Sequence, residues 1–157
     1  MIRMFSLLLL IIFSAACTPV VDLVEEKELV NSVLDKYDTA SSNEDSESFF
    51  SIFSEAEELA GFGLAANENW TNRSDFVRDM KVMFDIAADI RASSKNRVIE
   101  IHESGTIAYF NEILDISFTI QGNELQRHGI RFSGVMEKKD NKWQIMQFHF
   151  SMPFAPG

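Results

Sequence analysis

The stretch EKKDNKWQIMQFHFSM, residues 137–152, decides the fold of this chain. Asp140 and Asn141 tolerate the backbone of a tight turn, and apolar and polar side chains alternate on both sides of them. The pattern predicts a hairpin of two long strands, 126–138 and 142–152, closed by a three-residue loop at 139–141. One histidine, His149, lies in the second strand, and the face to which it points bears on whether it is a catalytic group.

In this hairpin Lys138 would lie opposite Lys142, and the register would sort the side chains onto two faces. The expected pairs are Phe132 with Phe148, Ile130 with Phe150 and Gly134 with Met146 on an aromatic face, and Arg131 with His149 and Ser133 with Gln147 on a polar face. A slip of one residue would mix the two faces. Because helices must bury their apolar sides against the aromatic face, we expect His149 on the outer face, in a scaffold or subunit contact. A catalytic or metal-binding role is the alternative, but no HxH, HExxH or His-Cys motif accompanies it.

Upstream of the hairpin, the chain changes from helical to strand periodicity. The predicted helices are 25–42, 45–53 and the segment after Asn72, whose sequence NRSD is typical of a helix N-terminus. The predicted strands are a glycine-containing segment at 59–64, then 98–102 and 106–121. Helices first and a strand meander second predict an α+β fold, in which the N-terminal helices pack on one face of a curved, mostly antiparallel sheet.

The first 17 residues, MIRMFSLLLLIIFSAAC, have a different character. Arg3 precedes an apolar run of about ten residues, which is short for a membrane-spanning helix. Small residues before Cys17 are typical of a signal-peptide cleavage site, and the cysteine after them resembles a bacterial lipobox, although Ser14 replaces the usual leucine. We therefore predict a signal peptide at 1–16 and a lipidated Cys17, with an ordinary secretory signal as the alternative.

Cys17 is the only cysteine of the chain, so an exported domain has no internal disulfide and depends on its core for stability. Cleavage leaves 141 of the 157 residues, enough for one domain. We expect a short tether at 17–24 and the domain at 25–157. Because Thr18 rather than Asp follows the cysteine, we expect a lipid anchor in the bacterial cell envelope, at the outer membrane if the cell is Gram-negative.

The charge balance excludes one class of partner. Of the 14 basic residues, the signal peptide removes Arg3, which leaves 13 against 24 acidic residues and a formal net charge of −11. Such a surface repels polyanions, and no basic cluster is present, so we expect no nucleic-acid binding. With His102 and His128 also isolated in the sequence, we expect no metal ion and no cofactor.

The order of elements resembles the nuclear transport factor 2-like superfamily, in particular its SnoaL-like members. The features that carry the resemblance, which spans residues 25–153, are ANENW at 66–70, IAYF at 107–110 and KKDNKWQIMQFHFS at 138–151. The last is similar to the final strand of the calcium/calmodulin-dependent kinase II association domain. The resemblance implies a cone in which a bent sheet wraps a long helix around a pocket, and a homodimer through the outer face of the sheet.

The resemblance also allows known pocket designs to be compared with this sequence. The kinase association domain holds anions with arginines, where this chain has Asn111, Gly134 and Phe150. Ketosteroid isomerase uses two carboxyl groups, at positions that match Gly61 and Ser133 here, and a tyrosine that matches Tyr37. Neither design is complete in this chain.

What remains is an aromatic pocket with few polar groups, which suits a small hydrophobic ligand. Its predicted lining consists of Tyr37, Phe53, Trp70, Phe84, Phe132, Phe148 and Phe150, with Asn111 and Asp115 as polar contacts. Asp115 is the best candidate acid or base if the domain is an enzyme. Alternatively the rings simply fill the core, and Asp115 is an ordinary solvated acid.

Three functional hypotheses follow. The leading one is a membrane-tethered SnoaL-like domain that binds a small hydrophobic ligand or a protein partner, without established catalysis. The second is a cofactor-independent lyase, isomerase or cyclase acting on a small hydrophobic substrate. The third is an envelope assembly protein that binds its partner through the sheet face.

Overall fold

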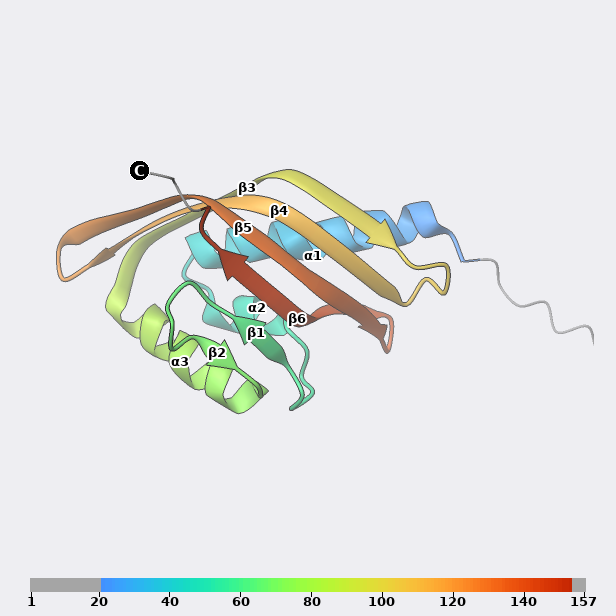
Figure 1. Cartoon of the computed structure of the whole chain (residues 1–157), viewed down its shortest axis with the longest axis horizontal. Helices are drawn as coiled ribbons and strands as arrows, with labels where there is room; N and C mark the ends of the chain where they lie inside the picture. The colour runs from blue at the N-terminus through green and yellow to red at the C-terminus, as the bar shows by residue number, and fades with distance from the viewer. Residues whose placement is uncertain (1–20, 154–157) are drawn as a thin grey trace, which may run out of the picture.

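The computed structural model describes residues 21–153. The elements follow in the order α1 (Leu23–Ser42), α2 (Ser46–Ser51), β1 (Ala60–Phe62), β2 (Asn69–Trp70), α3 (Arg73–Ile86), β3 (Ala87–Ile101), β4 (Ile107–Ile120), β5 (Asn123–Lys139) and β6 (Lys142–Ser151). The strands form one sheet in the order β2-β1-β6-β5-β4-β3, antiparallel except where β1 meets β6. Figure 1 shows the long strands as a curved sheet with the helices on one side of it, which confirms the predicted α+β architecture.

Helix α1 runs along the sheet and buries one side. The side chain of Asp22 caps its N-terminus by accepting hydrogen bonds from the amides of Val24 (2.9 Å) and Glu25 (3.2 Å). The buried residues recur at three- and four-residue spacing, as a helix that covers a sheet requires: Val30, Leu34, Tyr37 and Ala40. The helix begins at Leu23, so the last two residues of the predicted tether, 17–24, belong to it. Among residues 21–153, no helix is long and apolar enough to cross a membrane.

The β5–β6 hairpin has a tighter turn than predicted. Asp140 and Asn141 both adopt left-handed φ angles, 50° and 61°, and Lys139 pairs with Lys142, so the loop has two residues. A bulge at Met146 then shifts the register again, so that Phe132 lies opposite Phe150 and Ser133 opposite His149. The predicted pairs were therefore wrong. Because the shift after the bulge is two residues, the sorting of the two faces is preserved.

His149 is exposed on the outer face, as predicted. Its neighbour is not Arg131, which lies opposite Ser151. Instead its ring packs edge-to-face against that of Phe62, with the ring centroids 5.8 Å apart.

Strand β3 is much longer than the predicted segment 98–102. In the sequence ADIRASSKNR, polar residues interrupt the alternation of apolar and polar side chains, so the segment resembles a loop. The alternation is broken because the strand contains two bulges. Each bulge contains a residue with a left-handed φ angle, Asp89 (54°) and Asn96 (55°).

Side chains at the C-terminal end of α1 and just after it cover the free edge of β3. The amides of Ile90, Ala92 and Ser94 donate hydrogen bonds to the side chains of Glu44 (3.4 Å), Ser42 (2.9 Å) and Asp38 (2.9 Å), respectively. These bonds occupy edge amides that would otherwise be open to pairing with another strand. They also hold α1 against the sheet, and the candidate site lies between the two.

Candidate functional site

The interior between the helices and the sheet is filled with aromatic rings. All seven predicted rings belong to one network of ring contacts, which also includes Phe49, Phe76 and Phe110. Phe132 and Phe150 stack with centroids 4.3 Å apart, and Tyr37 lies 5.1 Å from Phe132. At these separations the rings contact one another directly, and most of the predicted pocket is solid core.

Phe148 shows how tightly this core is packed. Its ring lies directly against the α-carbon of Gly61 in β1, where a β-carbon would overlap the ring. Position 61 therefore has no room for the carboxylate that ketosteroid isomerase has there. Ser133, the other position compared, lies on the outer face opposite His149.

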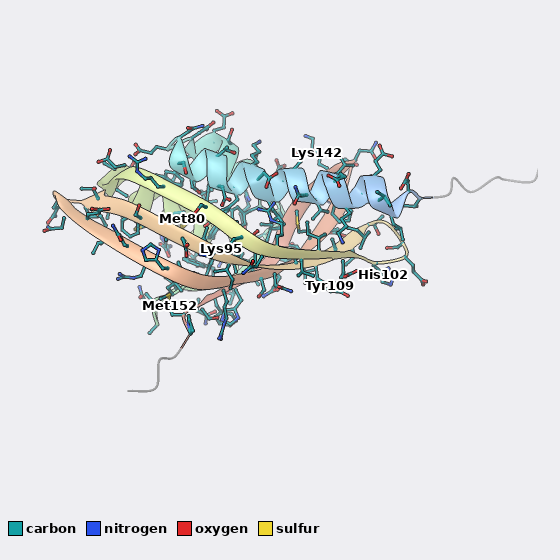
Figure 2. All side chains as sticks on the ribbon, turned by 90° about the horizontal axis from the view of Figure 1, so that it is seen from above. Met80, Lys95, His102, Tyr109, Lys142 and Met152 are labelled. Carbon is teal, nitrogen blue, oxygen red and sulfur yellow. The ribbon has the colours of Figure 1, made fainter. Side chains whose placement is uncertain are left out.

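A cavity of about 60 Å³ remains where α1, α2 and α3 meet β3 and β4. Apolar side chains dominate its lining, and the two polar ones are hydroxyls: Tyr37, Ser41, Phe49, Met80, Met83, Phe84, Ala87, Ile90, Ile116 and Phe118. We call it the α3 cavity. Figure 2 labels Met80, which lies toward the C-terminal end of α1. Of the predicted ligand contacts, Tyr37 and Phe84 line this cavity.

Tyr37 is the one titratable side chain in the lining. Burial raises the pKa of its phenol, and the nearby carboxyl groups of Asp38 and Glu112 raise it further. The hydroxyl is therefore protonated under ordinary conditions. It forms no hydrogen bond with the described residues and can donate one to a bound molecule.

Asn111 and Asp115 do not face the rings, so the expectation that they supply the polar contacts is wrong. Asn111 is exposed on the outer face, and the inward side chains in this part of β4 are Phe110, Glu112 and Leu114. Asp115 accepts hydrogen bonds from Lys95 Nζ (2.6 Å) and from the amide of Gly129 (2.8 Å). These bonds, with that of Lys95 the strongest, lower the pKa of Asp115, which makes it a poor proton donor.

The inward carboxyl group of β4 is Glu112, which was not among the predicted site residues. Its side chain has no exposed surface and is paired with Arg97, whose Nε donates to Oε2 at 2.5 Å. The other carboxyl oxygen, Oε1, has no hydrogen-bond partner among the described residues. Burial raises the pKa of Glu112 even though the bond from Arg97 opposes the shift.

Arg97 joins Glu112 to α1. Its Nη1 donates to the backbone and side-chain oxygens of Asn31 (3.2 and 3.0 Å) and to Asp35 (2.5 Å). The bulge at Asn96 turns Arg97 toward the helix, so that it lies on the same side as Ser94, three residues earlier. Without the bulge, residues an odd number apart would face opposite ways.

Asp38 completes this charged cluster, which consists of Asn31, Asp35, Asp38, Ser94, Arg97 and Glu112. It accepts hydrogen bonds from the amide and the hydroxyl of Ser94, both at 2.9 Å. Burial raises its pKa. The cluster thus places three carboxyl groups around one guanidinium, and it contributes charge next to Tyr37 without lining the α3 cavity.

No metal centre is formed by the part of the chain that the structure describes. Residues 21–153 contain no group of three or more His, Cys, Asp or Glu side chains placed to hold a metal ion. Cys17, the predicted lipidation site, lies outside the described residues.

Comparison with solved structures defines the class of fold. The chain superimposes on a nuclear transport factor 2-like superfamily protein from Salmonella enterica with a TM-score of 0.73, 16% identity and coverage of 87% of this chain and 96% of that one. A candidate dehydratase of the same superfamily from Streptomyces avermitilis gives a TM-score of 0.73, 12% identity and coverage of 85% and 100%. A candidate calcium/calmodulin-dependent protein kinase II association domain from Xanthomonas campestris gives 0.67, 17% identity and coverage of 80% and 87%. At these identities the likeness shows the fold alone.

The family follows from the sequence. The model of the SnoaL-like domain matches residues 30–155, and the chain therefore belongs to the SnoaL-like family within that fold. None of the curated proteins matches this chain.

Proposed function

We propose that this SnoaL-like domain binds a small hydrophobic molecule in the α3 cavity, without established catalysis. The observation that carries the proposal is the lining: eight apolar side chains, with the hydroxyls of Tyr37 and Ser41 as the polar contacts. Apolar pockets with few polar groups bind apolar ligands, and the unpaired phenol would fix the orientation of a ligand with an acceptor atom.

The size of the cavity sets the kind of ligand. Its volume of about 60 Å³ is about twice a water molecule's share of the liquid. Met80, Met83 and Phe84 are partly exposed, and methionine side chains adapt readily to a neighbour. Movement of this α3 wall would enlarge the cavity to the size of one aromatic ring.

Two substitutions with opposite effects on cavity volume test the proposal, with benzene as the probe. Phe84→Ala enlarges the cavity and should increase the rise in melting temperature that benzene causes, because ligands stabilise the state they bind. Ala87→Leu fills the cavity and should abolish that rise. Val82→Ala, at a position on α3 that is 54% exposed, is the control and should respond like the wild type. An equal response of wild type and Ala87→Leu would contradict the proposal.

We also propose that the domain is held at the membrane by a lipid on Cys17. The leader MIRMFSLLLLIIFSAAC and the absence of any other cysteine support this anchor. Cys17→Ser should move the protein from the membrane fraction to the soluble fraction of the envelope. Unchanged membrane association would refute lipidation.

A homodimer through the outer face of the sheet is the partner that we propose. One row across β3, β4, β5, β6 and β1 contains no Asp, Glu, Lys or Arg: Val98–Asn111–Ser133–His149–Phe62. Val98, Phe62 and the neighbouring Tyr109 are 47%, 52% and 56% exposed. Depletion of charge with exposed aromatic residues is typical of the centre of an interface.

A cofactor-independent lyase or isomerase is the second candidate, and Glu112 is the observation that favours it. A buried carboxyl group with a raised pKa and an unpartnered oxygen, near a buried tyrosine, is a candidate acid or base. A test is deuterium exchange at the α-carbon of the hydrophobic ketone 2-tetralone. Catalysis would appear as exchange above the buffer rate that Glu112→Gln and Tyr37→Phe both remove. Exchange at the buffer rate would exclude proton abstraction from this ketone.

A further inference from the structure

A groove on the helical side of the molecule, separate from the α3 cavity, has the features of a peptide site. We propose that it binds an extended acidic segment of a partner protein, which adds to the sheet at Trp143. The groove lies between α1, α2 and the start of β6, has a volume of about 390 Å³, and is lined among others by Leu29, Val33, Lys36, Ile52, Lys142 and Trp143. We call it the edge groove. Figure 2 labels Lys142, which lies beside α1.

The backbone of Trp143 forms an open sheet edge in this groove. Two residues further on, the amide of Ile145 donates to the carbonyl of Ile52 (2.8 Å), and its carbonyl accepts from the amide of Ser54 (2.8 Å). Residues two apart in a strand direct their backbone groups to the same edge, so Trp143 presents its N–H and C=O to that side. Outside the ladder of paired strands, no backbone hydrogen bond of the described residues involves either group. An extended chain can occupy such an edge by strand addition.

The floor of the groove is apolar and fixed in place. Trp143 is 5% exposed and Ile52 is 1% exposed, and Leu29 adds a side chain that is 42% exposed. The indole Nε1 of Trp143 donates to Glu26 Oε2 at 2.8 Å, and Glu26 also accepts from Lys138 at 2.6 Å, which holds the ring against α1. A rigid apolar floor of this kind receives apolar side chains with little loss of entropy on the protein's part.

Two lysines flank the groove without a carboxylate partner. Lys138, Lys95 and Arg97 form ion pairs with acidic side chains of the domain. Lys36, on α1, donates instead to the hydroxyl of Ser51 (2.8 Å), and Lys142, on β6, forms no ion pair with the described residues. In a chain with a surplus of acids, unpaired cations on both sides of an apolar groove are complementary to an acidic ligand. Glu55, which also lines the groove, is the one opposing charge.

These features together specify the ligand. Side chains of an extended peptide alternate between two sides, so apolar residues can rest on the floor while acidic residues between them reach the lysines. The backbone edge provides one N–H and one C=O for the pairing. The inference goes beyond the proposed function, because it needs neither the α3 cavity nor the lipid anchor.

The test uses the purified full chain and a capped hexapeptide of alternating glutamate and valine, with binding measured by calorimetry. The acidic peptide should bind, and the same peptide with lysine in place of glutamate should bind at least tenfold more weakly. Methylation of the central peptide nitrogens removes the hydrogen bonds of strand addition and should weaken binding at least fivefold. Equal binding of the acidic and the basic peptide, or no binding of either, would overturn the proposal.

Substitutions place the peptide in the groove. Lys36→Glu with Lys142→Glu should weaken binding of the acidic peptide at least tenfold, and Glu55→Gln should strengthen it two- to threefold. Lys81→Glu, an exposed lysine of α3, is the matched control and should leave the affinity unchanged. An equal loss of affinity in Lys81→Glu would show a general charge effect and would refute the assignment of this groove.

Discussion

Two regions that α1 covers differ in what holds them together. Near the C-terminal end of the helix, Tyr37 lies among rings, four of which are within 6.5 Å of its own. Near the middle of the helix, Arg97 alone links α1 to Glu112. The ring region has many interchangeable contacts, whereas the charged cluster depends on each member. We therefore expect the ring region to tolerate change and the charged cluster to fail when one partner is removed.

The largest expected effect is that of Arg97→Met. Removing the guanidinium leaves Glu112 buried without compensation, and breaking a buried ion pair in this way costs about 3–5 kcal/mol of unfolding free energy. Replacing both residues, Arg97→Met with Glu112→Met, should recover most of that loss. Denaturant unfolding of the two variants measures the difference. A single-variant cost below about 1 kcal/mol would show that the pair contributes little.

Phe132→Leu should have a smaller effect. Phe132 is fully buried and contacts Tyr37, Phe110 and Phe150. Replacing it with another apolar side chain should cost roughly 1–2 kcal/mol, because the neighbouring rings can move into part of the space. The same unfolding experiment measures it. A cost equal to that of Arg97→Met would remove the contrast between the two regions.

The charged cluster should also impose a pH dependence that the rings do not. Burial raises the pKa of Glu112 above its ordinary value in the folded protein, so the folded state holds this proton more tightly than the unfolded state does. The resulting stability is fully present below the unfolded-state pKa and is lost as the pH rises through the folded-state pKa. The unfolding free energy of the wild type relative to Glu112→Gln should therefore decrease with rising pH.

Unfolding of the wild type and of Glu112→Gln should be measured at pH values from below the unfolded-state pKa of Glu112 to above its folded-state pKa. The change in their difference in unfolding free energy shows whether stability falls or rises with pH. Asp38→Asn should show the same trend, because burial raises the pKa of Asp38 as well. If the unfolding free energy of the wild type relative to these variants increased with rising pH, the raised pKa of the two carboxyl groups would be contradicted.

The smallest expected effect on stability is that of Tyr109→Glu on the outer face. Tyr109 is 56% exposed, so the unfolding free energy of a monomer should change by no more than about 0.5 kcal/mol. If the outer face pairs two copies, the new charge should shift the dimer to monomer, which sedimentation measures. Glu100→Gln, at its cross-strand neighbour on β3, is the control and should leave the dimer intact. A dimer unaffected by Tyr109→Glu would place the interface elsewhere.

Much of the fold could be predicted from the sequence because the strong signals are local. The cap at Asn72, whose side chain accepts from the amide of Asp75, starts α3 at Arg73 as expected. The alternation around Asp140 and Asn141 identified the last hairpin. Its register could not be predicted because the turn has two residues rather than three, and because the bulge at Met146 has no clear sequence signature.

The candidate site was less predictable because the prediction assigned the wrong side chains of β4 to the inner face of the sheet. The resemblance to the kinase association domain places Asn111 in the pocket, and Asp115 shares the strand parity of Asn111, but Ala108, Phe110 and Leu114 show that even-numbered positions of β4 face inward. Glu112 lies in that apolar phase, and an acid in the buried phase of a strand is the signal that could have revealed it. Its partner Arg97 could not be found in this way, since the bulge at Asn96 alone turns it inward.

The central claim is that the α3 cavity receives a small apolar molecule, and the methyl groups of the methionines test it most directly. Met80 and Met83 line the cavity, whereas Met146 and Met152 are exposed elsewhere. In spectra of the full chain with ¹³C-labelled methionine methyl groups, added benzene should shift the Met80 and Met83 signals and leave those of Met146 and Met152 in place. Unmoved Met80 and Met83 signals at saturating benzene would contradict the claim.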